Sequence, residues 1–184
     1  MKNYFKFILF ICCSTLLCNV NLIAQKKPVA KKITKPVARP GVGTIPVLSF
    51  KNGIKLKSKG FKVKDAALYF DDNSKVPEDN LVEENQRISM LVTIDTGWAT
   101  VDGKVYPGAS EIIKLNTGYE VLSSEDLFKS YEETGVNPED AKYITLKAVI
   151  TKLDDKKKFI VVSFRIWDKK GTSEITGSYK FYIK

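Results

Sequence analysis

The chain has 184 residues and a formal net charge of +9, contains no histidine, and has its three cysteines, Cys12, Cys13 and Cys18, near its start. These cysteines lie in a stretch that we expect to be removed, so the mature protein would have neither residue type. This composition excludes thiolate nucleophiles, imidazole bases, disulfides and zinc sites with thiol or imidazole ligands, and we expect no bound metal or cofactor.

Residues 1–24 have the pattern of a secretory signal peptide. Lys2 and Lys6 supply a positive start, residues 7–17 are apolar, and cleavage is expected after Ala24. A lipoprotein attached through Cys18 is one alternative. An uncleaved anchor is another, because residues 7–25 carry no charge and approach the roughly 20 residues that span a bilayer. We predict an exported protein of the periplasm or the cell surface, although the lysines that follow favour the cytoplasmic side.

Residues 25–44 form a basic linker rich in proline, lysine and alanine. The motif Lys27-Pro28-Val29-Ala30-Lys31 returns as Lys35-Pro36-Val37-Ala38-Arg39. Proline removes hydrogen-bond donors and like charges repel one another, so an extended tether is expected. A second interpretation is adhesion to anionic lipids or acidic envelope polymers, which would be a peripheral membrane contact through the tail.

Most of the net charge lies in these two segments. The leader contributes two positive charges and residues 26–39 contribute six with no acid, which leaves +1 for the remainder. A neutral domain with a basic tail differs from a domain with a basic binding face, so nucleic acid is not an expected partner.

Residues 45–184 are predicted to form a single domain in which strand signals dominate. Apolar and polar residues alternate in several segments, as in half-buried strands. Asp102-Gly103 suits a type I′ turn and predicts a tight hairpin, whereas Pro107-Gly108 is expected to break the chain. The last three strands are expected to form an antiparallel meander. The predicted strands are 45–50, 61–70, 88–94, 98–101, 104–106, 111–115, 119–122, 143–150, 159–167 and 178–183.

One segment favours a helix. Ser123 or Ser124 can cap it, Glu125 and Asp126 suit the positive end of the helix dipole, and Gly135 can end it. With many short strands and one short helix, the sequence predicts an all-β fold. The expected architecture is an antiparallel β-sandwich, immunoglobulin-like or C2-like in outline, and a closed barrel is the alternative.

Two sets of residues are candidates for binding. Trp98, Tyr106 and Trp167 lie next to turns, where exposed rings can stack on sugars or anchor a protein interface; alternatively, the tryptophans close the ends of the core. Residues 51–64 carry six lysines and no acid, Lys57 and Lys59 among them, whereas residues 65–140 carry seventeen acids against five bases. This separation predicts either a charged docking face or lysines that protect edge strands.

Little in the sequence indicates catalysis or metal binding. The segments Asp71-Asp72-Asn73 and Glu78-Asp79-Asn80 could supply oxygen ligands for calcium, but they lack the spacing of an EF-hand. Carboxylate pairs such as Asp95 with Glu111 are inevitable among 21 acidic residues, and no nucleophile elbow is present. We therefore predict that the protein is not an enzyme.

Together these observations predict an exported, non-enzymatic protein–protein interaction module of the cell envelope. Its expected partner is an envelope protein or assembly, to which it docks as an accessory subunit through a sheet edge or a loop rim. A carbohydrate-binding module that uses the exposed aromatic residues is the alternative, and a secreted hydrolase is a third interpretation.

Overall fold

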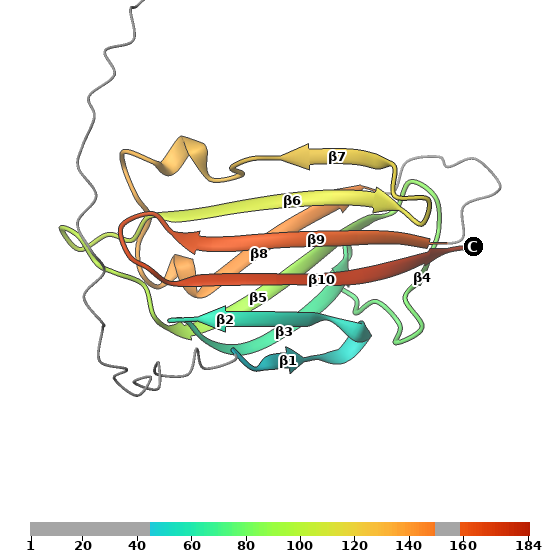
Figure 1. Cartoon of the computed structure of the whole chain (residues 1–184), viewed down its shortest axis with the longest axis horizontal. Coiled ribbons are helices and arrows are strands. Elements are labelled where there is room, and N and C mark those ends of the chain that lie inside the picture. Colours follow the sequence, from blue (N-terminus) through green and yellow to red (C-terminus); the bar gives the residue numbers. More distant parts are fainter. Residues whose placement is uncertain (1–44, 150–158) are drawn as a thin grey trace, which may run out of the picture. The chain divides into compact units, whose positions relative to one another are not determined.

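Two β-sheets pack face to face in the part of the chain that the computed structural model describes, residues 45–149 and 159–184 (Figure 1). The predicted signal peptide and basic linker lie outside these residues, as does the segment 150–158. Within the described ranges, no helix is long and apolar enough to cross a membrane.

The larger sheet, sheet A, has seven strands. Its main order is β1-β2-β10-β9-β6-β7, with antiparallel neighbours throughout, and β4 pairs in parallel with the end of β10. The strands are β1 (Val47–Ser49), β2 (Lys55–Lys59), β4 (Leu81–Val82), β6 (Pro107–Leu115), β7 (Glu120–Ser124), β9 (Phe159–Asp168) and β10 (Glu174–Ile183).

The smaller sheet, sheet B, has three antiparallel strands in the order β3-β5-β8. They are β3 (Lys62–Phe70), β5 (Arg87–Thr96) and β8 (Tyr143–Val149). Short 3₁₀ helices lie in the connections: η1 (Lys51–Gly53), η2 (Lys129–Tyr131) and η3 (Asp140–Lys142).

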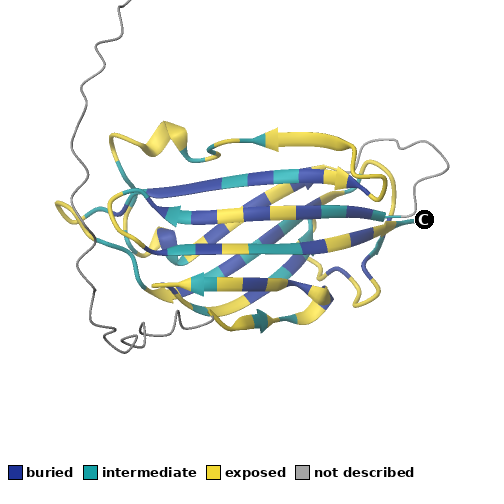
Figure 2. Cartoon of the chain, viewed as in Figure 1, coloured by how far each residue is buried: buried dark blue, intermediate teal, exposed yellow. Residues whose placement is uncertain are grey.

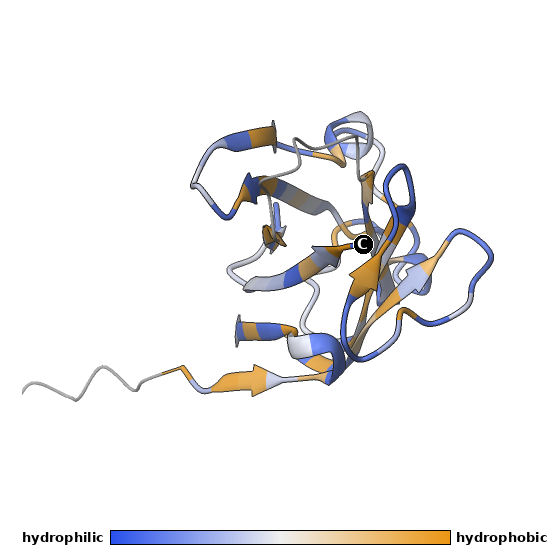
Figure 3. Cartoon of the chain, turned by 90° about the vertical axis from the view of Figure 1, so that its right-hand side faces the viewer, coloured by the Kyte–Doolittle hydropathy of each residue, from blue (hydrophilic) through white to orange (hydrophobic). Residues whose placement is uncertain are grey.

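The core lies between the two sheets and follows from alternation along the strands. In β8 the residues are exposed and buried in turn, with Ile144, Leu146 and Ala148 facing inward. Figure 2 shows the same alternation of buried and exposed residues along the central strands, and Figure 3 shows it as alternating hydropathy. Successive side chains of a strand point to opposite faces, so each sheet offers one apolar face to the other.

The predicted fold class is confirmed, because the described residues form a nearly all-β, largely antiparallel sandwich. The closed-barrel alternative is wrong, since each sheet ends in edge strands instead of closing on itself.

The predicted meander of the last three strands is wrong. β9 and β10 form a hairpin in sheet A, as expected, but β8 pairs with β5 in sheet B. Alternation shows that a strand is half-buried, but it does not specify which of the two sheets the strand joins.

The predicted helix after Ser123 is also wrong. Ser123 and Ser124 lie in β7, where they pair with Ile112 and with Glu111 of β6. The backbone N–H of Leu127 then donates to the carbonyl of Ala109 at 2.7 Å, which extends the contact with β6. Between Leu127 and Gly135 only the 3₁₀ turn η2 forms, because contact with β6 keeps the chain extended through the expected first turn of the helix.

The Asp102-Gly103 turn forms as predicted, but the predicted strands on either side of it, 98–101 and 104–106, do not pair with each other beyond Val101 and Lys104. Both turn residues have positive φ, and Val101 and Lys104 exchange two hydrogen bonds of 2.9 Å. Val105 instead pairs with Val136.

Two further strand predictions are corrected by the structure. Pro107-Gly108 does not break the chain, since Pro107 is the first residue of β6, a position that a proline tolerates in a strand. β2 is absent from the predicted strands because alternate lysines leave few apolar residues in it. Among these residues only Leu56 is buried.

Gly177 marks a close approach within sheet A. A Cβ there would collide with the ring of Phe164 and lie 2.8 Å from the carbonyl oxygen of Lys55. We expect Gly177→Ala to lower the free energy of unfolding by about 1–3 kcal/mol, because a packed core resists added volume. Chemical denaturation measures the change, and Thr176→Ala, at an exposed neighbour, is the control. Equal stability of the two variants would contradict the packing of β10 against β9.

Candidate functional site

The two sheets end in four edge strands that differ in how much backbone they offer. β1 has three residues and β7 has five. β3 is longer, but the backbone N–H groups of Phe70 and Val76 bond with the carbonyls of Ser74 and Leu68, so residues 74–76 run along its outer side. β8 has seven residues and pairs with β5 alone among the described strands. It is therefore the longest open edge in this part of the chain.

The outer face of sheet B flanks this edge and carries apolar side chains. Tyr143 and Val149 of β8 are 60% and 50% exposed. A hollow of about 540 Å³ lies beside them on the same sheet. It is lined by Tyr69, Phe70, Asp71, Asn73, Ser89, Leu91, Thr145 and Lys147.

β7 exposes both of its faces, as Figure 2 shows. Leu122 pairs with Ile113 and shares its inward face, yet Leu122 is 47% exposed while Ile113 is 5% exposed. Sheet A has seven strands against three in sheet B, so β7 lies beyond the area that sheet B covers.

The outer face of sheet A carries three of the six lysines of the lysine-rich segment, Lys55, Lys57 and Lys59. Strand register aligns residues of β2, β10 and β9 in three rows: Lys59–Glu174–Trp167, Lys57–Thr176–Arg165 and Lys55–Ser178–Ser163. Three of the predicted site residues, Lys57, Lys59 and Trp167, thus share one face. Arg165 bonds to Glu174 at 3.0 Å and stacks on Trp167, with the guanidinium carbon 4.7 Å from the ring centre.

Trp98 and Tyr106 do not join this face. Trp98 follows β5, contacts the ring of Phe61 edge-on at 4.6 Å, and donates its indole N–H to the carbonyl of Ala141 at 3.1 Å. Tyr106 precedes β6, and the ammonium group of Lys170 lies 5.0 Å from its ring centre. Both rings are only partly exposed, and both have partners within the domain.

Sequence reasoning missed a pair of asparagines that fastens one end of the sandwich. Asn52 of η1 and Asn80 before β4 are buried and have positive φ. The side-chain amide of Asn52 donates to the side-chain oxygen of Asn80 at 2.7 Å; the amide of Asn80 donates to the backbone oxygens of Asn52 and Lys180 at 2.7 and 2.8 Å. The turn-like dipeptides Asn52-Gly53 and Asp79-Asn80 were the only available signal for this pair.

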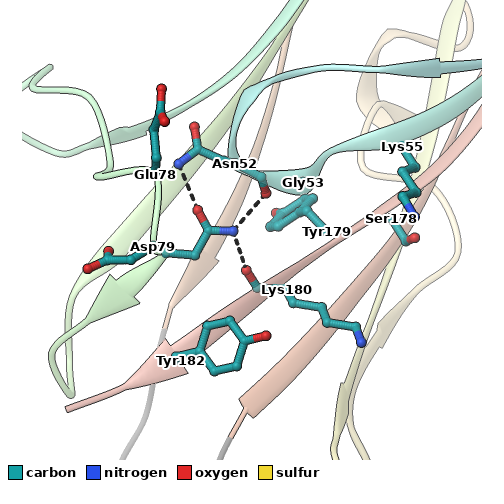
Figure 4. Close-up of a pocket in the computed structure, with 10 residues that line it drawn as sticks. Asn52, Gly53, Lys55, Glu78, Asp79, Ser178, Tyr179, Lys180 and Tyr182 are labelled. Atoms are coloured by element: carbon teal, nitrogen blue, oxygen red, sulfur yellow. Dashed lines mark hydrogen bonds between the residues drawn. The ribbon is translucent and has the colours of Figure 1, made fainter.

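A cleft of about 460 Å³ opens beside these asparagines (Figure 4). Glu78 and Asp79 lie on one side of it, and Lys55 and Ser178 lie on the other. The carboxylate of Asp79 accepts the backbone N–H of Leu81 at 2.9 Å, so it serves as a turn cap.

In the other segment considered for calcium binding, residues 71–73, a carboxylate likewise accepts a backbone hydrogen bond within its own turn. The Asp72 carboxylate accepts the backbone N–H of Ser74, and the hydrogen bonds from Ser74 lower the pKa of Asp72. Across residues 45–149 and 159–184, no group of three or more acidic, histidine or cysteine side chains gathers to hold a metal ion.

Glu111 occupies an inward-facing position in the middle of β6 and is 1% exposed. Its neighbours on that face are Ala109 and Ile113, and the hydroxyl of Tyr179 donates to its carboxyl group at 3.4 Å. Burial raises the pKa of Glu111, and the hydrogen bond from Tyr179 opposes this only in part. The alternation of β6 could have shown from the sequence that Glu111 points inward.

Comparison with known proteins does not assign a family. No family model matches the chain, and no curated protein matches it. Solved structures with a similar fold include the C-terminal domain of wzt, at 13% identity and a TM-score of 0.46, covering 74% of this chain and 81% of that one.

Two further structures show the same general likeness. A Niemann-Pick type C2 protein from Japanese carpenter ant has 13% identity and a TM-score of 0.39, covering 74% of this chain and 100% of that one. The PmoD soluble domain from Methylocystis sp. (Rockwell) has 10% identity and a TM-score of 0.36, covering 77% and 98%. Similarities of this size do not extend to function.

The raised pKa of Glu111 predicts how stability depends on pH. A carboxyl with a higher pKa in the folded state binds more protons there, so its contribution to stability is lost as pH rises from the ordinary value of 4.5 through the folded pKa. We expect the free energy of unfolding of the wild type to fall over that range and Glu111→Gln to abolish this fall. Urea denaturation at a series of pH values measures it.

Glu120→Gln, which removes an exposed carboxylate, is the matched control and should keep the wild-type pH profile. A Glu111→Gln profile as steep as that of the wild type would show that Glu111 is not the group responsible.

Proposed function

We propose that this protein is an exported, non-enzymatic protein–protein interaction module of the cell envelope, acting as an accessory subunit of an envelope or secretion assembly. An extended segment of its partner adds a strand to sheet B along β8. The observation that carries this proposal is the unpaired side of β8, a seven-residue strand that has a neighbour on one side only among the described residues.

Strand addition uses the backbone that an edge already presents. Alternate residues of β8 direct their N–H and C=O groups away from β5, and a partner strand can satisfy them. Side chains then provide selectivity: Tyr143 and Val149 offer apolar contacts, and the hollow beside Thr145 and Lys147 can accept a side chain of the added strand. Backbone pairing would supply general affinity and these contacts would select the sequence.

The other edges are less suitable for this mode. β3 has register shifts between Lys62 and Val63 and between Val63 and Asp65, and bulges of this kind twist an edge away from pairing. β1 is three residues long. β7 is open, but a five-residue strand offers fewer backbone groups than β8.

The environment of the carboxylates supports a non-enzymatic role. The buried Asp168 accepts the backbone N–H groups of Ala99 and Lys170 at 2.6 and 2.9 Å. Asp126 forms a largely buried ion pair with Lys169 at 2.6 Å, and Glu111 lies inside the core. A hydrolase would need two free carboxylates facing one accessible cleft. Asp126 and Asp168 line a common hollow, but both are held by the contacts above. In the cleft beside Asn80, Glu78 pairs with Lys51 and Asp79 caps a turn.

The partners of the three aromatic rings favour protein docking over stacking on sugars. Arg165 covers part of Trp167, Lys170 lies over Tyr106, and Phe61 packs against Trp98. Sugar stacking needs an open ring face. Export rests on the sequence pattern of residues 1–24, and direct sequencing of the mature N-terminus tests it.

Site-specific crosslinking tests the docking edge. A photo-crosslinking amino acid in place of Thr145 on β8 should give one defined adduct with an envelope protein in intact cells. The same group in place of Ser123 on β7 should not. With the identified partner added, the alternate backbone amides of residues 143–149 that face away from β5 should exchange at least about tenfold more slowly, because pairing protects them.

A matched pair of charge variants distinguishes docking along β8 from docking along β7. Thr145→Lys should weaken the complex, because an added edge charge hinders strand addition, whereas Ser123→Lys should leave it intact. Crosslinking from position 123 but not 145, or exchange protection outside β8, would contradict the proposal.

A further inference from the structure

We propose that the outer face of sheet A binds an acidic polysaccharide, through a hollow formed by β2, β10 and β9. The hollow has a volume of about 420 Å³ and lies on the opposite side of the sandwich from the outer face of sheet B. It is lined by Val47, Lys55, Leu56, Lys57, Ser163, Thr176, Gly177 and Ser178. This site is independent of the β8 edge and of the partner proposed for that edge.

The shape of the hollow follows from the sizes of the side chains in its rows. Ser163, Thr176 and Ser178 are short and lie on β9 and β10, while Lys55 and Lys57 rise beside them from β2. Gly177, between the two β10 residues, faces inward with Ile175 and Tyr179 and contributes only backbone to the floor. The result is a shallow floor of hydroxyl groups with a wall of ammonium groups along one side.

The charged side chains around the hollow favour binding of an anion. Among the described residues, neither Lys55 nor Lys57 forms an ion pair. The adjoining Lys59 lies next to Glu174, whose carboxylate already pairs with Arg165. The lining of the hollow contains two lysines and no acidic residue, and the carboxylate of Glu174 beside it is paired with Arg165, so a bound anion meets net attraction.

The spacing of the lysines favours a polymer over a small ion. Lys55, Lys57 and Lys59 occupy alternate positions of one strand, so their stems leave the sheet about 7 Å apart along β2. A chain with one anionic group per repeating unit can contact several of them at once, which gains affinity by multivalency. The hydroxyl groups beside them can exchange hydrogen bonds with sugar hydroxyls.

Other polyanions fit this surface less well. Single-stranded nucleic acid needs open aromatic faces for its bases, but Arg165 lies over Trp167 and Lys180 lies over Phe159, 4.9 Å from its ring centre. A membrane surface needs apolar side chains that insert between lipids. Val47 is the exposed apolar residue of the lining, so a hydrophilic polymer is favoured.

Binding of a defined polymer to the full chain tests the proposal. Polygalacturonate is the acidic polysaccharide, dextran is the neutral control, and phosphatidylcholine vesicles containing phosphatidylserine represent an anionic membrane. We expect saturable binding of polygalacturonate and none of dextran. The double variant Lys55→Ser with Lys57→Ser should weaken polygalacturonate binding by about tenfold and reduce its salt slope by about 2, as expected when two contacts to anions are lost.

Two comparisons distinguish binding in this hollow from attraction that depends only on the net charge of the protein. Lys64→Ser with Lys75→Ser removes the same charge from exposed positions outside the hollow and should change the affinity less than the first double variant does. Thr176→Val keeps every charge and should also weaken binding, because it removes a hydroxyl from the floor. Thermal unfolding confirms that each variant is folded.

Three results would overturn the proposal. They are an equal loss of affinity in the two double variants, no binding of polygalacturonate by the folded wild type, and vesicle binding that is both as tight as polymer binding and equally sensitive to Lys55 and Lys57. The first would indicate that only net charge matters, and the last would assign the face to a membrane.

Discussion

The structure depends on the burial of two apolar faces of unequal width. A sheet of seven strands packs against one of three, so only the middle strands of sheet A are covered. Burial of apolar area drives the packing, and the inward residues of β9 and β10 lie in its centre. The strands outside this overlap gain less from it, which explains why β7 exposes both of its faces. The same inequality leaves β8 as an edge with no neighbour beyond it among the described residues.

Polar contacts hold the ends of the sandwich, where apolar burial is least effective. Asn52 and Asn80 join η1, the segment before β4, and β10. At another point, Asp168 connects the end of β9 to Ala99, and Lys169 connects the same turn to Asp126. Asn52, Asn80 and Asp168 are buried, Lys169 and Asp126 are largely so, and all five are hydrogen-bonded, as buried polar groups must be to avoid a large cost of desolvation. The connections at the ends of the sandwich are thus held by a few specific side chains.

The two proposed surfaces differ in their chemistry and lie on different sheets. The β8 edge offers unpaired backbone with apolar side chains beside it, which suits an extended polypeptide. The β2, β10 and β9 hollow offers lysines and hydroxyl groups, which suits an anionic chain of sugars. Acidic residues lie largely in connections, such as Asp72, Asp79 and Glu139, while Lys55, Lys57 and Lys59 project from a single strand. The charge separation seen along the sequence therefore becomes, in part, a separation in space.

The sequence by itself determined the fold class, the Asp102-Gly103 turn and the positions of most strands. These features depend on local physics: the two-residue period of a strand, and the backbone conformation that aspartate and glycine tolerate. It also placed the lysines on alternate positions of one short segment. The alternation of inward and outward residues in β6 would also have shown from the sequence that Glu111 points inward.

Only the tertiary structure decided which strands are neighbours. β8 joins β5, and Ser123 with Ser124 pair with β6 instead of capping a helix. Pairing partners depend on contacts between residues far apart in the chain, where a local pattern fits several neighbours equally well. The same reason explains why Lys57, Lys59 and Trp167 share a face while Trp98 and Tyr106 do not: strand register brings the first three together, and no local pattern in the sequence encodes that register.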